Sequence, residues 1–226
     1  MIRVFVGFDT RETVAFNVLS HSIQSRASEP VQIAPLSLSQ LDGLLWRERH
    51  VLQSTDFSFS RFLTPYLSEY KGWSMFCDCD MLMLDDIAKL WELRDDTFAV
   101  QVVKHDHRPV GDSKFLNEPQ SRYQKKNWSS MILFNNAKCS ALTLDYINSA
   151  SGLELHQFKW LESDELIGEL PSRWNHLVDY NPTLPVDEVS LIHFTEGGPY
   201  FEKYKDCSYS DLWIAERNKM LHVAPS

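Results

Sequence analysis

Two aspartates, Asp78 and Asp80, interrupt an apolar stretch of the sequence, SMFCDCDMLML (74–84). Carboxylates are rarely buried unless an opposite charge or a metal ion accompanies them. In an extended strand, residues i and i+2 point to the same side, so both side chains can face one cation. Magnesium and manganese ions prefer oxygen ligands and share them with substrate phosphates. The stretch therefore predicts a divalent-metal site at a strand end, with a solvated strand end as the other interpretation.

The four cysteines, Cys77, Cys79, Cys139 and Cys207, are too few and too scattered to indicate a disulfide framework. A reducing, cytoplasmic location is the simplest expectation. Because Cys77 and Cys79 alternate with the two aspartates, we expect both thiols on the opposite face of the strand. There they would serve as small core residues rather than as metal ligands.

The charge balance argues against a nucleic-acid partner, since 22 Lys and Arg residues stand against 31 Asp and Glu residues, a formal net charge of −9. The first residues, MIRVFVGFD, lack the features of a signal peptide. No stretch approaches the ~18 apolar residues of a membrane span. We therefore expect no integral membrane segment, and peripheral attachment at the inner face of a membrane stays open.

Apolar runs typical of strands alternate with segments of helical period along the first 150 residues. The expected strands are 2–9, 31–36, 73–84, 98–103 and 127–136, and the expected helices are 10–26, 56–70, 86–93 and 140–150. Pro65 should break the second helix unless it lies in the first turn. The alternation predicts one α/β domain over 1–226 with a mainly parallel sheet.

The chain becomes more irregular after residue 150 and ends in a segment of helical period, YSDLWIAERNKML (209–221). Its residues Leu212, Trp213, Glu216 and Met220 fall near one helical face. We expect this face to pack on the core or on a second subunit, so a homodimer stays open. Basic residues are sparse in the segment, which argues against membrane contact.

The segment FCDCDML (76–82) resembles the Asp-X-Asp motif of nucleotide-sugar glycosyltransferases with the GT-A fold. It is most similar to the retaining family-8 type, which includes glycogenin and bacterial lipopolysaccharide galactosyltransferases. Five blocks follow the order of that family: VFVGFDTRETVAF (4–16), SFSRFLTPYL (58–67), the Asp-Cys-Asp segment, LESDELIGELPSRWN (161–175) and LIHFTEGGPYF (191–201). The resemblance implies a GT-A-like α/β fold with a mixed, mainly parallel central sheet flanked by helices. Residues 1–150 would then form the nucleotide-sugar-binding core, and 151–226 the acceptor-side loops and C-terminal helix.

The resemblance also implies a set of site residues. Asp78, Asp80 and His193 would hold a manganese or magnesium ion, and Arg61 would pair with the metal-site carboxylates or with the donor. The residues implied to bind the donor are Phe8, Asp9, Arg61, Asp78, Cys79, Asp80, Gly197, Gly198 and Lys203. Among these, Asp9 belongs to the loop that holds the base and ribose in the family. Gly197 and Gly198 would let the backbone approach the diphosphate closely.

Catalytic roles fall, by the same resemblance, to Asp164, Glu165 and Arg61. Glu165 stands where the family usually has Gln, and either acid would stabilise a cationic sugar in the transition state. Gly198 stands where the family has a lysine, so Lys203 is the candidate that replaces the lost charge.

Three further segments indicate a role in substrate binding less specifically than the five blocks do. The strand that normally opens Asn-Ala/Ser-Gly in the family carries Trp128, Ser129 and Ser130 here. The segment KHDH (104–107) is spaced too tightly for a structural zinc site, and the resemblance makes it a loop at the donor sugar, where Lys104 and Asp106 would contact substrate. For the pair Trp174 and Asn175 in LPSRWN (170–175), an acceptor-site role and a core role stay open.

Together with this resemblance, these features lead us to expect a metal-dependent glycosyltransferase that moves a sugar from a nucleotide-diphosphate donor, a UDP-hexose, to a glycan or glycolipid acceptor. The resemblance implies that the transfer proceeds with retention. One alternative is a sugar-phosphate nucleotidyltransferase. The basic, glycine-rich loop expected of that class is missing from GFDTRETVAF (7–16). The other alternative is a non-catalytic domain that binds a nucleotide-sugar or a glycan.

Overall fold

A six-stranded sheet forms the centre of the part of the chain that the structure describes, residues 1–48, 53, 55–106 and 125–223 of a computed structural model. In spatial order its strands are β2 (Val31–Leu36), β1 (Ile2–Gly7), β3 (Trp73–Cys77), β6 (Met131–Asn135), β5 (Val100–Val102) and β7 (Ile167–Glu169). Strand β1 pairs in parallel with β2 and β3, and β5 pairs in parallel with β7. Strand β6 runs antiparallel to both of its neighbours. The sheet is therefore mixed, as expected.

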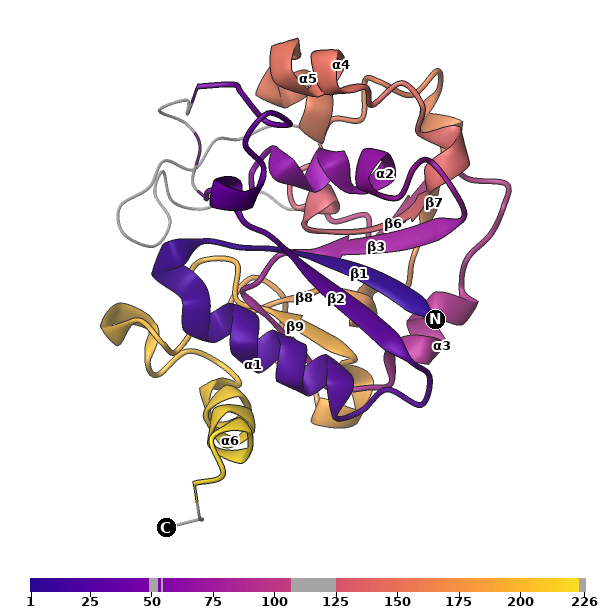
Figure 1. Cartoon of the computed structure of the whole chain (residues 1–226). Coiled ribbons are helices and arrows are strands. Elements are labelled where there is room, and N and C mark those ends of the chain that lie inside the picture. Colours follow the sequence, from indigo (N-terminus) through magenta and orange to yellow (C-terminus); the bar gives the residue numbers. More distant parts are fainter. Residues whose placement is uncertain (49–52, 54, 107–124, 224–226) are drawn as a thin grey trace.

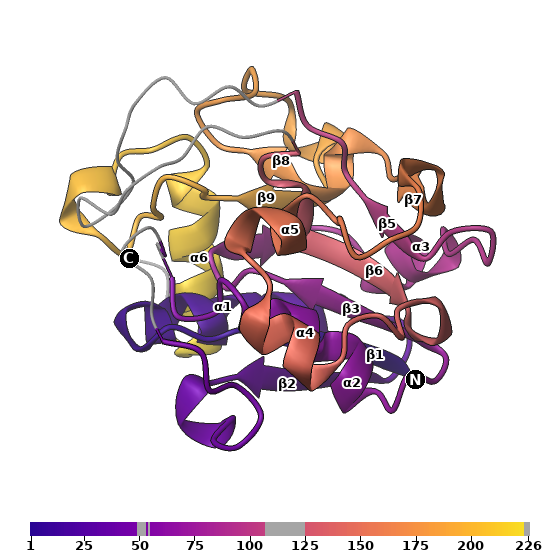
Figure 2. The same cartoon turned by 90° about the horizontal axis from the view of Figure 1, so that it is seen from above.

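A second sheet of three strands lies below the first in Figure 1 and is ordered β4 (Met81–Met83), β9 (Leu191–His193) and β8 (His176–Leu177). Helix α1 (Thr13–Gln24) and helix α6 (Ser210–Met220) lie on the same side of the large sheet as this second sheet. Helices α2 (Thr64–Leu67), α4 (Leu144–Ser149) and α5 (Gly152–His156) cover the opposite side (Figures 1 and 2), and the short helix α3 (Ile87–Glu92) directly follows β4 in the chain. The large sheet is thus covered on both faces.

The central strands are buried because both faces of the sheet are covered. All five residues of β6 are buried, and so are the last four of β3. Apolar side chains without a period of two are what a strand covered on both faces requires. Helix α6 packs on the chain's own core: Trp213 is 1% exposed, and Glu216 forms ion pairs of 2.7 Å with His21 and Arg26 of the α1 region.

The prediction of one continuous strand over 73–84 is wrong. Strand β3 ends at Cys77, β4 begins at Met81, and the two strands belong to different sheets. The segment 78–80 is the connection between them, and its backbone is fixed at both ends. The N–H of Asp78 donates to the carbonyl of Ser130, and the carbonyl of Asp80 accepts from the N–H of Phe194, both at 2.9 Å.

Other boundaries also differ from the expected ones. The first strand ends at Gly7 because Asp9 caps a 3-10 turn, Thr10–Glu12, that leads into α1. The expected helix over 56–70 is a 3-10 turn, Ser60–Leu63, followed by α2, which has a proline in its first turn, where proline is tolerated. The first half of 127–136 is a 3-10 turn, Trp128–Ser130, and only the second half is strand.

Within the described residues, the helices lack the length and apolar character that a bilayer span requires.

Candidate metal centre and its surroundings

Asp78, Asp80 and His193 lie together at the point where the two sheets meet, and one possible ligand atom from each lies within 4.8 Å of the others. The antiparallel pairing of β4 with β9 places Met81 opposite His193, which brings the end of β9 next to the aspartates. All three residues are buried, with exposed fractions of 9% for Asp78, 6% for Asp80 and 2% for His193. The structure therefore gathers the three residues that the sequence analysis proposed as metal ligands.

The chemistry of this cluster fits a divalent cation. The Oδ1 atom of Asp80 accepts no hydrogen bond from the described residues, although it is buried. It faces Nε2 of His193 at 3.4 Å. A buried carboxylate oxygen without a donor is unfavourable unless a cation compensates it. Two carboxylates and one imidazole are a ligand set that manganese or magnesium accepts, so these residues fit the implied ion.

Arg61 holds one of the two aspartates. It lies on the 3-10 turn before α2 and is 5% exposed. Its Nη1 atom lies 3.0 Å from Oδ1 of Asp78 and donates to the carbonyl of Ser129 at 2.7 Å. The guanidinium also lies 5.0 Å from the centre of the Phe76 ring. The predicted pairing of Arg61 with a metal-site carboxylate is present in the structure, and its contact with a donor stays a prediction.

A buried asparagine contacts the ring nitrogen of His193 that points away from Asp80. Its Nδ1 atom lies 3.0 Å from Oδ1 of Asn175, and the amide nitrogen of Asn175 donates to Oγ of Ser130 at 2.9 Å. Asn175 is fully buried, and Trp174 is 3% exposed. Of the two interpretations of this pair, the structure therefore favours the core role over contact with an acceptor.

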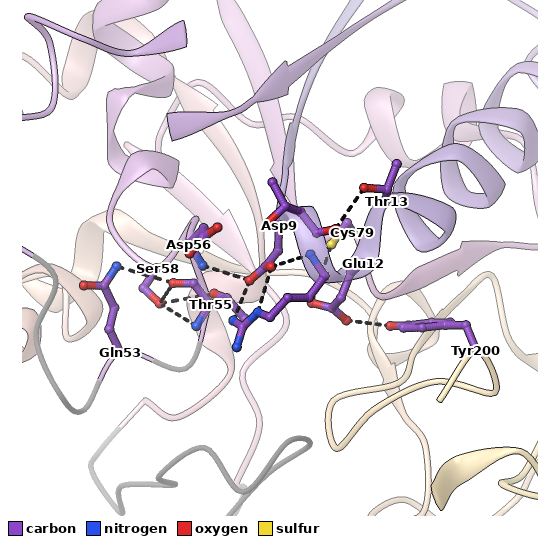
Figure 3. A network of polar contacts seen from close by, with 11 residues as sticks. Asp9, Glu12, Thr13, Gln53, Thr55, Asp56, Ser58, Cys79 and Tyr200 are labelled. Carbon is purple, nitrogen blue, oxygen red and sulfur yellow. Dashed lines mark hydrogen bonds and ion pairs between the residues drawn. The ribbon is translucent and has the colours of Figure 1, made fainter. Parts of the chain in front are cut away.

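Glu12 is the important residue that the sequence analysis did not single out (Figure 3). It reads as an ordinary acid at a helix start, but it is fully buried. The hydroxyl of Tyr200 donates to its Oε1 at 2.7 Å, and Sγ of Cys79 lies 4.0 Å from its Oε2. Burial and then the negative charge of Asp80 raise the pKa of Glu12 to about 8. No local signal marks it, because its hydrogen-bond partner Tyr200 comes from a distant part of the sequence.

Asp9 is buried and bonded within the chain (Figure 3). Its Oδ1 accepts from the backbone N–H and from Nε of Arg11, both at 2.9 Å, and its Oδ2 accepts from Nη2 of Arg11 at 2.7 Å and from the N–H of Asp56 at 3.1 Å. Burial alone would raise the pKa of Asp9, but these hydrogen bonds hold it below its ordinary value. Phe8 packs edge-on against Phe16, with ring centres 5.4 Å apart. Contacts of Phe8 and Asp9 with a base or ribose stay predictions.

The two glycines of the late block have local structural reasons. Gly197 has a φ of +135°, a conformation that L side chains rarely adopt. A Cβ atom at Gly198 would lie 2.3 Å from the Tyr200 ring. Lys203 lies on the exposed turn Glu202–Tyr204, with its amine 5.0 Å from the centre of the Tyr204 ring. Contacts of these residues with a diphosphate stay predictions.

Asp164 and Glu165 lie on an exposed 3-10 turn before β7, rather than in the buried cluster. Oδ1 of Asp164 pairs with the amine of Lys125 at 2.6 Å, and this hydrogen bond lowers the pKa of Asp164. Their catalytic roles stay predictions. In the 104–107 segment, Lys104 lies 5.8 Å from the centre of the Trp128 ring, and His107 lies outside the described residues.

Cys77 and Cys79 are both fully buried free thiols, so the prediction that they are core residues is confirmed. They do not share the face of one strand, however, because Cys79 belongs to the connection between the sheets.

Comparison with known proteins identifies relatives at two levels. No model of a known protein family matches the chain. A curated protein of Arabidopsis thaliana, Protein CDI, is 48% identical over 221 residues, which cover 95% of this chain and 85% of that protein.

Solved structures are similar at 10–15% identity. The glycosyltransferase GlyE of Streptococcus pneumoniae has a TM-score of 0.64 at 13% identity, and the match covers 98% of this chain and 62% of GlyE. The galactosyltransferase LgtC has a TM-score of 0.59 at 10% identity, with 96% of both chains covered. The bifunctional glycosyltransferase WbbM has a TM-score of 0.58 at 15% identity, and the whole of this chain matches only 52% of it. These likenesses show the GT-A-like fold, and the expected fold class is confirmed.

Proposed function

Because the chain belongs to the family of the plant Protein CDI and has the GT-A-like fold of solved glycosyltransferases, we propose that it is a metal-dependent glycosyltransferase. Its donor would be a nucleotide-diphosphate sugar, a UDP-hexose in the first instance. The observation that carries the proposal is the buried group of Asp78, Asp80 and His193, in which Oδ1 of Asp80 accepts no hydrogen bond from the described residues and faces the imidazole.

Each residue of the cluster has a role in the proposed reaction. Asp78, Asp80 and His193 would hold manganese or magnesium, and the bound ion would offset negative charge on the leaving diphosphate. Arg61 holds Asp78 in position through a short, buried ion pair. Orientation of the sugar carbon against the acceptor hydroxyl would supply much of the rate. Burial strengthens these electrostatic effects because water is largely absent.

The finer parts of the proposal come from the resemblance to retaining family-8 enzymes. We infer transfer with retention to a glycan or glycolipid acceptor, with residues 1–150 binding the donor and 151–226 lining the acceptor side. Asp164 or Glu165 would stabilise the cationic sugar, which their exposed position allows only if the substrate reaches that turn. LgtC was solved with analogues of both donor and acceptor sugars, which supports a donor and an acceptor site on one such fold.

A non-catalytic sugar-nucleotide binder is the second candidate, and one feature favours it. Gly198 stands where family-8 glycosyltransferases have a lysine in the diphosphate-binding block. The Tyr200 ring lies so close to Gly198 that it leaves no room for a side chain. Lys203 nearby in sequence is exposed and would have to supply the missing charge.

One assay separates the candidates. The purified chain is incubated with a panel of nucleotide-sugars and manganese, with and without excess EDTA, and the release of nucleoside diphosphate and free sugar is measured. We expect slow hydrolysis of one UDP-sugar that EDTA abolishes. Metal-dependent binding without turnover would establish the binder instead. Synthesis of a nucleotide-sugar from a nucleoside triphosphate and a sugar phosphate would establish a nucleotidyltransferase.

The metal requirement is tested separately by calorimetric titration of UDP. We expect the affinity for UDP to fall at least about tenfold, or 1.4 kcal/mol, when EDTA replaces manganese, because ion and phosphate oxygens would bind together. Equal affinity in EDTA would reject the metal bridge and leave the two aspartates as a buried structural pair.

A further inference from the structure

A chain of hydrogen bonds runs from His193 through the protein interior to a backbone carbonyl. Nδ1 of His193 lies 3.0 Å from Oδ1 of Asn175, and Nδ2 of Asn175 lies 2.9 Å from Oγ of Ser130. The hydroxyl of Ser130 donates to the carbonyl of Asn127 at 2.6 Å. These side chains are 0–8% exposed, so water competes little for the bonds.

The carbonyl of Asn127, at the end of this series of hydrogen bonds, sets the donor and the acceptor of every bond in the series. A carbonyl oxygen only accepts, so the single hydroxyl proton of Ser130 is directed toward Asn127. The hydroxyl oxygen can then only accept from Asn175, which turns the amide nitrogen toward Ser130 and the amide oxygen toward His193. An amide oxygen also only accepts, and Nδ1 of His193 must therefore carry a proton. The opposite orientation of the Asn175 amide would place two acceptors together at Ser130 and bring the amide N–H groups to Nδ1.

We propose that Ser130 and Asn175 are positioning residues that keep the proton of His193 on Nδ1 and leave Nε2 to face Asp80 and a cation. The inference rests on the proposed function in that it takes His193 as a metal ligand. A ligand histidine commonly donates its second ring N–H to a neighbouring acceptor, which fixes both its tautomer and its orientation. Here that acceptor is itself oriented by a serine and a carbonyl.

Ser130 also forms a hydrogen bond with Asp78, a second residue of the proposed metal site. Its carbonyl accepts the backbone N–H of Asp78 at 2.9 Å. The preceding residue, Ser129, offers its carbonyl to Arg61, which pairs with Asp78. The short turn Trp128–Ser130 therefore holds ligands from both the connection 78–80 and β9. This turn carries Trp128, Ser129 and Ser130 where the resemblance to family-8 glycosyltransferases implies an Asn-Ala/Ser-Gly pattern.

Nuclear magnetic resonance tests the donor–acceptor direction of these hydrogen bonds without metal or substrate. Long-range proton–nitrogen spectra of the metal-free protein report which ring nitrogen of His193 is protonated, and the signal is assigned by its loss in His193→Gln. We expect Nδ1 to be protonated. An unprotonated Nδ1 in the wild type would overturn the proposal, whatever the enzyme's activity. Absence of glycosyl transfer would count against the proposed function and leave this result standing.

Two variants test the positioning role. Ser130→Ala removes the acceptor of Asn175, so we expect mixed protonation of His193 and about tenfold weaker manganese binding in calorimetry. Asn175→Asp keeps an acceptor at Nδ1, so Nδ1 should stay protonated. The control is Ser74→Ala, since Ser74 is also buried and donates to a buried asparagine, Asn136, at 2.8 Å.

We expect the control to lose stability comparably and to keep manganese affinity. Wild-type protonation and affinity in Ser130→Ala would overturn the role, and so would an equal loss of affinity in Ser74→Ala. If Ser130→Ala fails to fold, the spectrum of Asn175→Asp decides, because loss of the Nδ1 proton there contradicts the proposal.

Discussion

Replacing Glu12 by Gln should stabilise the metal-free protein at neutral and alkaline pH. Glu12 is fully buried, and burial together with the charge of Asp80 raises its pKa from the ordinary value of 4.5 to about 8. The folded protein therefore retains a proton that the unfolded chain releases between these two pH values. Proton uptake on folding means that the free energy of unfolding falls as pH rises through this window.

The magnitude follows from the two pKa values. A difference of this size corresponds to as much as about 5 kcal/mol by pH 8, and to almost nothing below pH 4.5, where both states are protonated. The variant keeps an amide oxygen that can accept from Tyr200, so the wild type and Glu12→Gln should have similar stability near pH 5. Their difference should then grow steadily with pH in favour of the variant.

Urea unfolding at several pH values between 5 and 9, in EDTA, measures this difference. Manganese should flatten the pH dependence of the wild type, because a cation at Asp80 removes the second largest cause of the raised pKa. A constant offset between wild type and variant across the pH range would refute the reasoning, because it would mean that Glu12 is ionised even in the folded protein at pH 5. Tyr200→Phe serves as the control that removes the hydrogen bond to Glu12 and retains the carboxylate.

Three other substitutions test separate parts of the structure. Asp80→Asn should weaken manganese binding by roughly tenfold or more in calorimetry, because the ion loses a charged ligand. The same substitution should raise the melting temperature in EDTA, since it removes a buried charge. An unchanged manganese affinity would remove Asp80 from the ligand set. Arg61→Lys should lower donor turnover at least about tenfold, or 1.4 kcal/mol, because lysine lacks the Nε–H that bonds the Phe57 carbonyl and the flat guanidinium that lies against the Phe76 ring, which together hold Nη1 at Asp78. Wild-type kinetics would make Arg61 purely structural. Gly198→Ala should destabilise the fold by about 1–3 kcal/mol in urea unfolding, since its Cβ would meet an aromatic ring at 2.3 Å.

The sequence predicts the position of most strands because their apolar runs are local. The segments 31–36 and 98–103 and the helix near the C-terminus all lie at or within a few residues of the observed elements. The failure at 73–84 has a different origin. Apolar residues on both sides of the aspartates indicate burial, but burial does not reveal that the chain changes sheets between Cys77 and Met81. That change depends on β9, which is distant in sequence.

The same limit explains which site residues were predictable. Asp78, Asp80 and His193 could be proposed because a motif and its order along the chain mark them. Glu12 and Asn175 could not be given their observed places, since each is defined by a partner from a distant segment: Tyr200 for one and His193 for the other. Residue type alone made Glu12 an ordinary helix-start acid, which is favoured at that end of a helix for its charge.

The change of sheet also gives the aspartates their geometry. A continuous strand would place Asp78 and Asp80 side by side on one face, with no histidine near them unless a loop supplied it. Because the chain turns at 78–80, each aspartate is fixed next to a different sheet: the N–H of Asp78 bonds to Ser130, the residue before β6, and the carbonyl of Asp80 bonds to the residue after His193. Two rigid sheets thus determine the distance between the ligands. A substitution that loosens the contact between the sheets should therefore weaken metal binding even when every ligand is intact.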